Sequence, residues 1–150
     1  MGDAMQRSIL AAAAFIILLP SCSGTSLPAG PAGPPPSSAS APLNIGFVLY
    51  TRSGTPGTLN ARWNYANAYS GPGVATGGPG SGGFAGRYHV RYFLENGEFS
   101  DEYDLEIEKR VASDFYDVTW IVNGTVSARG VGMEVDEGNS LAVGWRRIAD

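Results

Sequence analysis

The chain contains very little cysteine, histidine or lysine, with one residue of each among 150. The single cysteine, Cys22, cannot form an internal disulfide, so the fold must depend on a hydrophobic core. Nucleic-acid binding normally requires a basic surface, but 14 acidic residues outnumber 10 basic ones and the net charge is −4. The longest apolar run, residues 8–19, is shorter than the roughly 20 residues of a membrane-spanning helix. We therefore expect neither a disulfide framework nor a nucleic-acid partner.

Motifs for catalysis and metal binding are also missing. His89 has no Gly-x-Ser-x-Gly motif to supply a nucleophile, and the glycine-rich stretch 77–83 lacks the Lys-Ser or Lys-Thr of a phosphate-binding loop. Asp101, Glu102 and Asp104 lack the loop spacing of a calcium site, because successive side chains of a strand point to opposite faces. We expect no enzymatic activity, no cofactor and no bound metal.

Residues 1–21 are predicted to be a signal peptide. Arg7 precedes the apolar run 8–19, and a run of about a dozen residues has the length of a signal-peptide core. Asp3 is atypical of the positively charged region that begins such peptides. A start of translation at Met5 in place of Met1 would remove it.

The apolar run ends in Leu19-Pro20-Ser21-Cys22, which resembles the lipobox of bacterial lipoproteins. The lipobox has an aliphatic residue, two small residues and cysteine, and Pro20 is the one departure. The resemblance implies cleavage before Cys22 and acylation of this residue with palmitate-type chains, two or more of which hold a protein stably on a membrane. Ser23 is similar to the residue that follows the cysteine in lipoproteins of the outer membrane. The alternatives are a conventional secretory peptide with an incidental cysteine and a short uncleaved anchor.

Residues 22–43 are predicted to be a linker between Cys22 and the folded domain. Apart from Cys22, they consist almost entirely of proline, glycine, alanine, serine and threonine, which cannot bury enough apolar surface to offset the entropy of ordering. Proline-rich chains extend by roughly 3.1 Å per residue, so this segment would hold the domain away from the membrane. Recognition of its PxxP pattern by a partner is the alternative.

Residues 44–150 are predicted to form one all-β domain. Short apolar and aromatic runs alternate with glycine-rich breaks, and no stretch keeps a helical period. We expect about eight antiparallel strands, arranged as a small up-and-down barrel or a sandwich. The expected strands lie near 45–51, 58–66, 72–76, 84–94, 99–109, 115–122, 125–135 and 140–147.

Two Asn-Gly pairs predict the register of two hairpins. A two-residue type I′ turn at Asn96-Gly97 separates charged pairs from apolar pairs on opposite faces. The expected pairs are Arg87–Glu106, His89–Asp104 and Arg91–Glu102 outside, with Tyr88–Leu105, Val90–Tyr103 and Leu94–Phe99 inside.

At the second pair a two-residue turn would put Arg129 on the face of Trp120, so we predict the three-residue loop Val122-Asn123-Gly124. The expected pairs are then Trp120–Val126, Val118–Ala128 and Tyr116–Gly130 inside, with an Asp117–Arg129 ion pair outside.

The domain also resembles a group of small secreted bacterial β-domains. The likeness covers roughly residues 58–147, and its motifs are Gly86-Arg-Tyr-His-Val, Tyr116-Asp-Val-Thr-Trp, Gly130-Val-Gly and Leu141-Ala-Val-Gly-Trp. Most such domains are uncharacterised and some are labelled fibronectin-binding, so the resemblance supplies no catalytic residue. The strand number is similar to the calycin layout of lipocalins and avidins, although the lipocalin Gly-x-Trp signature is absent. That likeness concerns the fold alone.

Aromatic side chains are the most plentiful candidates for a binding site. Six are expected to point inward, where they would either pack as core or line a ligand cavity: Tyr88, Tyr92, Tyr103, Tyr116, Trp120 and Trp145. Trp63, Tyr65 and Tyr69 are expected to form an exposed patch beside the 77–83 loop. We expect a lipid-anchored envelope protein whose domain binds a protein partner or plays a structural role. The alternative is a carrier of a small apolar ligand, and an enzyme of unknown class is third.

Overall fold

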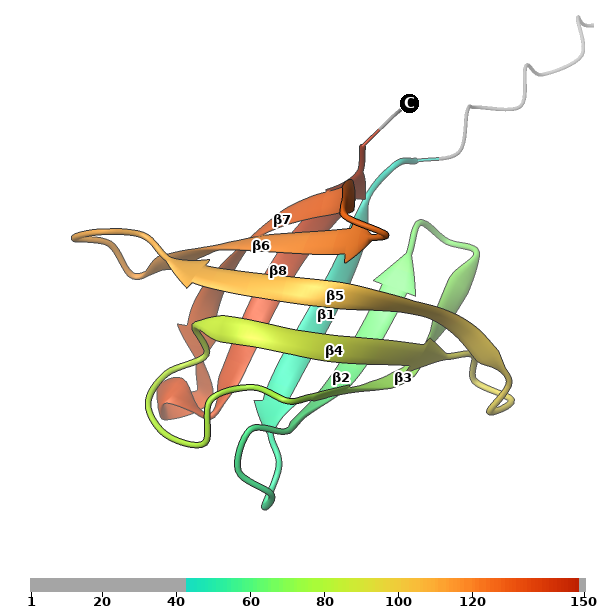
Figure 1. Cartoon of the computed structure of the whole chain (residues 1–150). Helices are drawn as coiled ribbons and strands as arrows, with labels where there is room; N and C mark the ends of the chain where they lie inside the picture. Colours follow the sequence, from blue (N-terminus) through green and yellow to red (C-terminus); the bar gives the residue numbers. More distant parts are fainter. Residues whose placement is uncertain (1–42, 149–150) are drawn as a thin grey trace, which may run out of the picture. The chain divides into compact units, whose positions relative to one another are not determined.

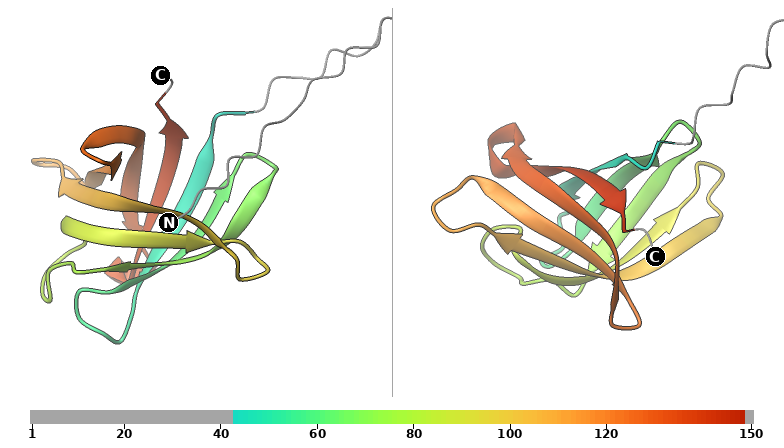
Figure 2. Two further views of the ribbon diagram at one scale, coloured as in Figure 1. Left: turned by 45° about the vertical axis from the view of Figure 1, so that its right-hand side comes forward. Right: turned by 90° about the horizontal axis from the view of Figure 1, so that it is seen from above.

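A computed structural model describes residues 43–148, which form a closed barrel of eight antiparallel strands (Figures 1 and 2). The strands are β1 (Gly46–Arg52), β2 (Leu59–Tyr65), β3 (Tyr69–Thr76), β4 (Gly86–Phe93), β5 (Phe99–Lys109), β6 (Phe115–Val122), β7 (Thr125–Val135) and β8 (Ser140–Arg147). Each strand pairs with its neighbours in sequence, and β1 closes the barrel against β8. The short helical turn η1 (Asp136–Gly138) connects β7 to β8. The prediction of an all-β fold is confirmed, and the form it takes is the barrel.

The barrel forms because apolar and polar residues alternate along its strands, so that one set of side chains meets inside. In β4 every second residue is buried, and these residues are Tyr88, Val90 and Tyr92. Complete burial of one large apolar side chain contributes about 1.5–3 kcal/mol. Residues 43–148 contain both neighbours of every strand and one continuous core, so the unit Ala39–Asp150 can fold by itself.

The first Asn-Gly hairpin has a longer turn than predicted. The amide of Leu94 donates to the carbonyl of Glu98 at 2.8 Å, and only Gly97 of the loop has a left-handed φ (+85°). The loop therefore has three residues, and Phe93 pairs with Phe99, so the predicted Leu94–Phe99 pair is wrong. A β-bulge at Ser100 absorbs the one-residue shift. Beyond the bulge all the other predicted pairs are confirmed: Arg87–Glu106, His89–Asp104, Arg91–Glu102, Tyr88–Leu105 and Val90–Tyr103.

The second hairpin has a shorter turn than predicted. Asn123 (φ +50°) and Gly124 (φ +78°) form a two-residue turn, and Val122 pairs with Thr125. We predicted the three-residue loop in order to keep Arg129 off the face of Trp120. The extra residue of a second bulge, at Ser127, has this effect instead, so the predicted loop is wrong. The predicted inward pairs are therefore shifted by two residues, and the observed pairs are Trp120–Ala128, Val118–Gly130 and Tyr116–Gly132.

The predicted Asp117–Arg129 ion pair is also wrong. Because of the bulge, Asp117 lies opposite Val131. Its carboxylate instead accepts hydrogen bonds from the guanidinium of Arg110, the shortest of them 2.6 Å long. This contact lowers the pKa of Asp117.

The two ends of the barrel differ. At the end that carries the 53–58, 77–85, 110–114 and 136–139 connections, Phe84 is completely buried and plugs the interior. The guanidinium of Arg52 lies 4.4 Å from the centre of the Phe84 ring and donates to the carbonyls of Gly82 and Gly138. We call this the closed end. The opposite end, with the turns at 66–68, 94–98 and 123–124, is called the open end.

The predicted signal peptide, lipidated Cys22 and linker lie outside the described residues, apart from Leu43. Among residues 43–148 there is no helix with the length and apolar character to span a membrane.

Candidate ligand-binding pocket

A pocket of about 540 Å³ opens into the barrel interior at the open end. Aromatic side chains dominate its lining, and they come from strands β2 to β6 and β8: Trp63, Tyr65, Tyr69, Tyr92, Phe99, Tyr103, Trp120 and Trp145. All three tryptophans of the chain belong to this lining. A pocket of this size and composition is typical of sites for small organic ligands.

Small residues opposite the large rings give the rings their space. The indole of Trp145 lies directly against the Cα of Gly46 on the neighbouring strand, where any Cβ would collide with it. A Cβ on Gly73 would approach within 2.6 Å of the Tyr92 ring. Ring positions in the pocket are therefore set by glycines on adjacent strands.

The rings contact one another around the pocket wall. Tyr65 stacks on Trp145 with centroids 5.2 Å apart and planes 18° apart, and Trp120 lies 5.9 Å from Trp145. Tyr92 lies 5.8 Å from Trp63 and 6.1 Å from Tyr103 in tilted arrangements. Tilted and offset ring pairs each contribute about 0.5–1.5 kcal/mol beyond the area they bury.

The polar groups at the bottom of the pocket are hydrogen-bonded to one another. The indole N–H of Trp120 donates to the hydroxyl of Tyr92 at 2.9 Å, and this hydroxyl lies 2.5 Å from that of Tyr50. Burial raises the pKa of Tyr50 and the pKa of Tyr92 far above that of an exposed tyrosine. Both phenols are therefore neutral at physiological pH, and the bottom of the pocket has no charge.

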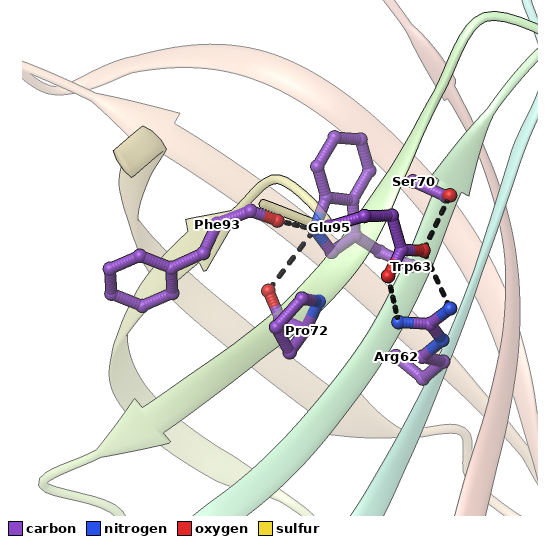
Figure 3. A network of polar contacts seen from close by, with 6 residues as sticks. All are labelled: Arg62, Trp63, Ser70, Pro72, Phe93 and Glu95. Carbon is purple, nitrogen blue, oxygen red and sulfur yellow. Dashed lines mark hydrogen bonds and ion pairs between the residues drawn. The ribbon is translucent and has the colours of Figure 1, made fainter. Parts of the chain in front are cut away.

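A second polar network fixes one side of the pocket mouth (Figure 3). The indole N–H of Trp63 is shared between the carbonyls of Phe93 (3.1 Å) and Pro72 (3.2 Å). Beside it, Glu95 accepts hydrogen bonds from Arg62 (2.6 and 2.9 Å) and from Ser70 (2.7 Å).

The contact with Arg62 lowers the pKa of Glu95, and that with Ser70 lowers it further. This network joins β2, β3 and the turn that connects β4 to β5 on the exposed side of the mouth.

Only two of the pocket-lining residues are charged, Asp101 on β5 and Arg147 on β8. Both bulges of the barrel also lie at this mouth, since Ser100 and Ser127 line the pocket. Bulges are common at the rims of barrels and beside functional sites, because they re-aim the side chains next to them. Sequence reasoning missed Asp101, Arg147 and both serines, because their places depend on bulges and on the barrel's closure.

The six aromatics predicted to face inward are divided between the two ends. Tyr92, Tyr103, Trp120 and Trp145 line the pocket. Tyr88 and Tyr116 are buried at the closed end. There the hydroxyl of Tyr88 donates to the carbonyl of Phe84 at 2.9 Å, and the Tyr116 ring meets the Phe84 ring edge-on. The interior is thus packed at one end and hollow at the other.

The three predicted partner-surface residues lie in the pocket lining. Trp63 and Tyr65 are half-buried, and Tyr69 is exposed at the mouth. Their predicted place beside the 77–83 loop is wrong, because this loop follows the far end of β3 and lies at the closed end. The prediction relied on the short distance in sequence between these residues and the loop. In the structure the whole length of β3 lies between them.

The remaining polar candidates form no further site. His89 is exposed, 3.4 Å from Glu102 and 3.5 Å from Asp104, as expected for a cross-strand surface contact. Among the described residues no three histidine, cysteine or acidic side chains gather closely enough to hold a metal ion.

Comparison of the chain with protein-family models, with curated protein sequences and with solved structures found no match.

Proposed function

We propose that the barrel binds a small organic ligand in the pocket at its open end. The observation that supports this proposal is the contrast between the two ends: Phe84 fills one, while the other keeps a 540 Å³ hollow lined with rings. Ligand sites of about 300–1,000 Å³ with mainly apolar walls are common in barrel mouths. The internal hydrogen bonds of Trp63, Trp120 and Tyr92 leave largely apolar surface facing the pocket.

Tryptophan fluorescence tests this proposal directly, because every tryptophan of the chain lines the pocket. A panel of small aromatic compounds should include some that change the emission saturably. Ala128→Leu places a larger side chain beside Trp120 and should weaken the response about tenfold or more by occupying the hollow. Ala142→Leu makes the same exchange on β8 outside the pocket lining and should leave the response unchanged. A saturable response that both variants retain would place binding elsewhere.

Binding of a protein partner is the second candidate function, and the outer wall of the barrel supports it. Phe47, Leu49, Phe115, Val131 and Met133 lie in adjoining register rows on β1, β6 and β7, and we call these five residues the apolar strip. All except Leu49 are among the exposed large hydrophobic residues. Such contiguous exposure is typical of interaction surfaces.

The chemistry of a partner follows from the groups beside the apolar strip. A groove passes over Gly144 and is lined by Arg129 and Arg146, neither of which forms an ion pair with another described residue. Asp117 also lines it, but its carboxylate is paired with Arg110. A matching protein surface has an apolar centre flanked by carboxylates. A photo-crosslinker placed at Val131 should form an adduct with the partner protein. The double variant Arg129→Glu, Arg146→Glu should abolish this adduct. The same adduct from a crosslinker at exposed Arg87, on the far wall, would oppose this candidate.

We further propose that the domain is held at the cell envelope, most simply at the outer membrane, through acylated Cys22. The lipobox-like Leu19-Pro20-Ser21-Cys22 and the proline-rich linker after it support this proposal. Cys22→Ala should abolish metabolic labelling with palmitate and leave the precursor uncleaved. Labelling that persists in the variant would rule out this attachment.

A further inference from the structure

The mouth of the pocket contains a carboxylate among aromatic rings. Asp101 is half-buried on β5, next to Tyr103 on the same inward face and opposite Tyr92. The bulge at Ser100 sets this orientation, since Phe99 on its other side is an exposed residue at the rim of the pocket, and its ring lies against Phe93 and Arg91. The Ser100 hydroxyl donates to the Asp101 carboxylate at 2.7 Å. Without the bulge-induced change of face, Phe99 and Asp101 would point the same way.

Asp101 has no cationic partner among residues 43–148, since the ion pairs there involve other carboxylates. The negative charge of Asp101 acts on Tyr103 in the pocket. Burial raises the pKa of the Tyr103 phenol, Asp101 raises it further, and Arg147 lowers it. A neutral ligand that covered Asp101 would remove water from the carboxylate without compensation, which is costly.

Arg147, the other charge, is already engaged at the outer rim. Its guanidinium carbon lies 5.0 Å from the centre of the Tyr65 ring, and its side chain is exposed. Asn44 fixes its backbone through two 2.9 Å hydrogen bonds. An anionic ligand would gain from Arg147 alone, while the ring faces of the pocket and Asp101 would both repel it.

We propose that the pocket is selective for organic cations, that is, for ligands with an ammonium or quaternary ammonium group next to an apolar body. The inference deepens the proposed ligand-binding function and depends on it. The cation lies against the aromatic rings near Tyr103 and faces the Asp101 carboxylate, which becomes paired on binding. Aromatic rings attract cations most strongly where water is excluded. Arg147 opposes this attraction and limits the affinity.

The test measures the binding of three probes of one shape to the fragment 39–150 by tryptophan fluorescence and by calorimetry. The probes are benzyltrimethylammonium, its neutral isostere neopentylbenzene and the anion phenylmethanesulfonate. Asp101→Asn should weaken binding of the cation about tenfold and leave the neutral probe unaffected or tighter. Arg147→Gln should strengthen binding of the cation by about threefold. Glu102→Gln is the matched control, because it removes the same charge from the adjacent, outward-facing position of β5.

The outcomes separate this inference from the proposed function. Saturable binding of the neutral probe, with cation affinity that is equal in the wild type and Asp101→Asn, would overturn cation selectivity and keep the pocket as a ligand site. Preferred binding of the anion, lost in Arg147→Gln, would also overturn the inference. No binding of any probe or of the aromatic panel would overturn the proposed function itself.

Discussion

The indole N–H of Trp120 donates to the hydroxyl of Tyr92 at 2.9 Å, across the interior of the barrel from β6 to β4. The Tyr92 hydroxyl in turn lies 2.5 Å from that of Tyr50 on β1. Three strands that are not neighbours are thus linked at the point where the packed core ends and the pocket begins.

The phenylalanine variant of Tyr92 should destabilise the barrel. It removes the shared hydroxyl and leaves both the Trp120 N–H and the Tyr50 hydroxyl buried without this partner. We expect a loss of about 1–3 kcal/mol in the free energy of unfolding, measured by urea titration. Tyr69→Phe makes the same change at an exposed position and should cost far less. An equal loss of unfolding free energy in the two variants would show that the buried hydroxyl contributes no more to stability than the exposed one.

Alkaline pH should unfold the protein because Tyr50 and Tyr92 lose their protons. The pKa values of Tyr50 and Tyr92 are raised in the folded state, so the contribution of these groups to stability is complete below the unfolded pKa of about 10. It is lost as the pH rises from there through the folded pKa values, because the unfolded chain releases its protons first. The part of the tyrosinate absorbance that comes from these two buried residues should therefore appear together with the loss of near-ultraviolet circular dichroism. Full tyrosinate absorbance in a still folded protein would contradict this expectation.

Substitution of Gly46 by alanine should disturb the pocket, because the new Cβ would collide with the Trp145 indole. We expect a loss of about 1–3 kcal/mol in unfolding free energy and a shift in tryptophan emission. Gly144→Ala supplies the control on the neighbouring strand, where a Cβ meets nothing within 4 Å. If Gly144→Ala were as harmful as Gly46→Ala, strand propensity and not the indole contact would explain the loss.

Deletion of Ser100 should be tolerated, since Phe99 and Asp101 would then follow each other in regular alternation against Phe93 and Tyr92. Deletion of Asp104, opposite His89 in the regular part of β5, should prevent folding, because it turns every residue on one side of the gap to the wrong face. Circular dichroism and the cooperativity of thermal unfolding distinguish the two. An unfolded Ser100 deletion would mean that the bulge is required for closure.

The alternation of residues was enough to predict which parts of the chain are strands and, in the regular parts of β4 to β6, which side chains point inward. It did not place Trp63 and Tyr65, which were expected in an exposed patch and line the pocket, or Phe99, which was expected inside and is exposed. Along β4 the prediction from residues 84–94 agrees with the observed face of each residue from Arg87 to Tyr92. The turns were harder, because an Asn-Gly pair fits both a two-residue turn and a three-residue loop. Each incorrect turn length concealed a bulge, at Ser100 or at Ser127, that restores the inward face of the strand.

The sequence by itself determined the strand pattern and the inward faces of the regular strand segments, because strand alternation is a local property of neighbouring residues. Only the tertiary structure decided that Tyr88 and Tyr116 pack as core while Trp120 and Trp145 surround a hollow. The reason is that the space around a ring depends on residues from other strands. Gly46 makes room for Trp145 only once β1 has closed on β8, and Phe84 fills one end only once its loop has folded over it.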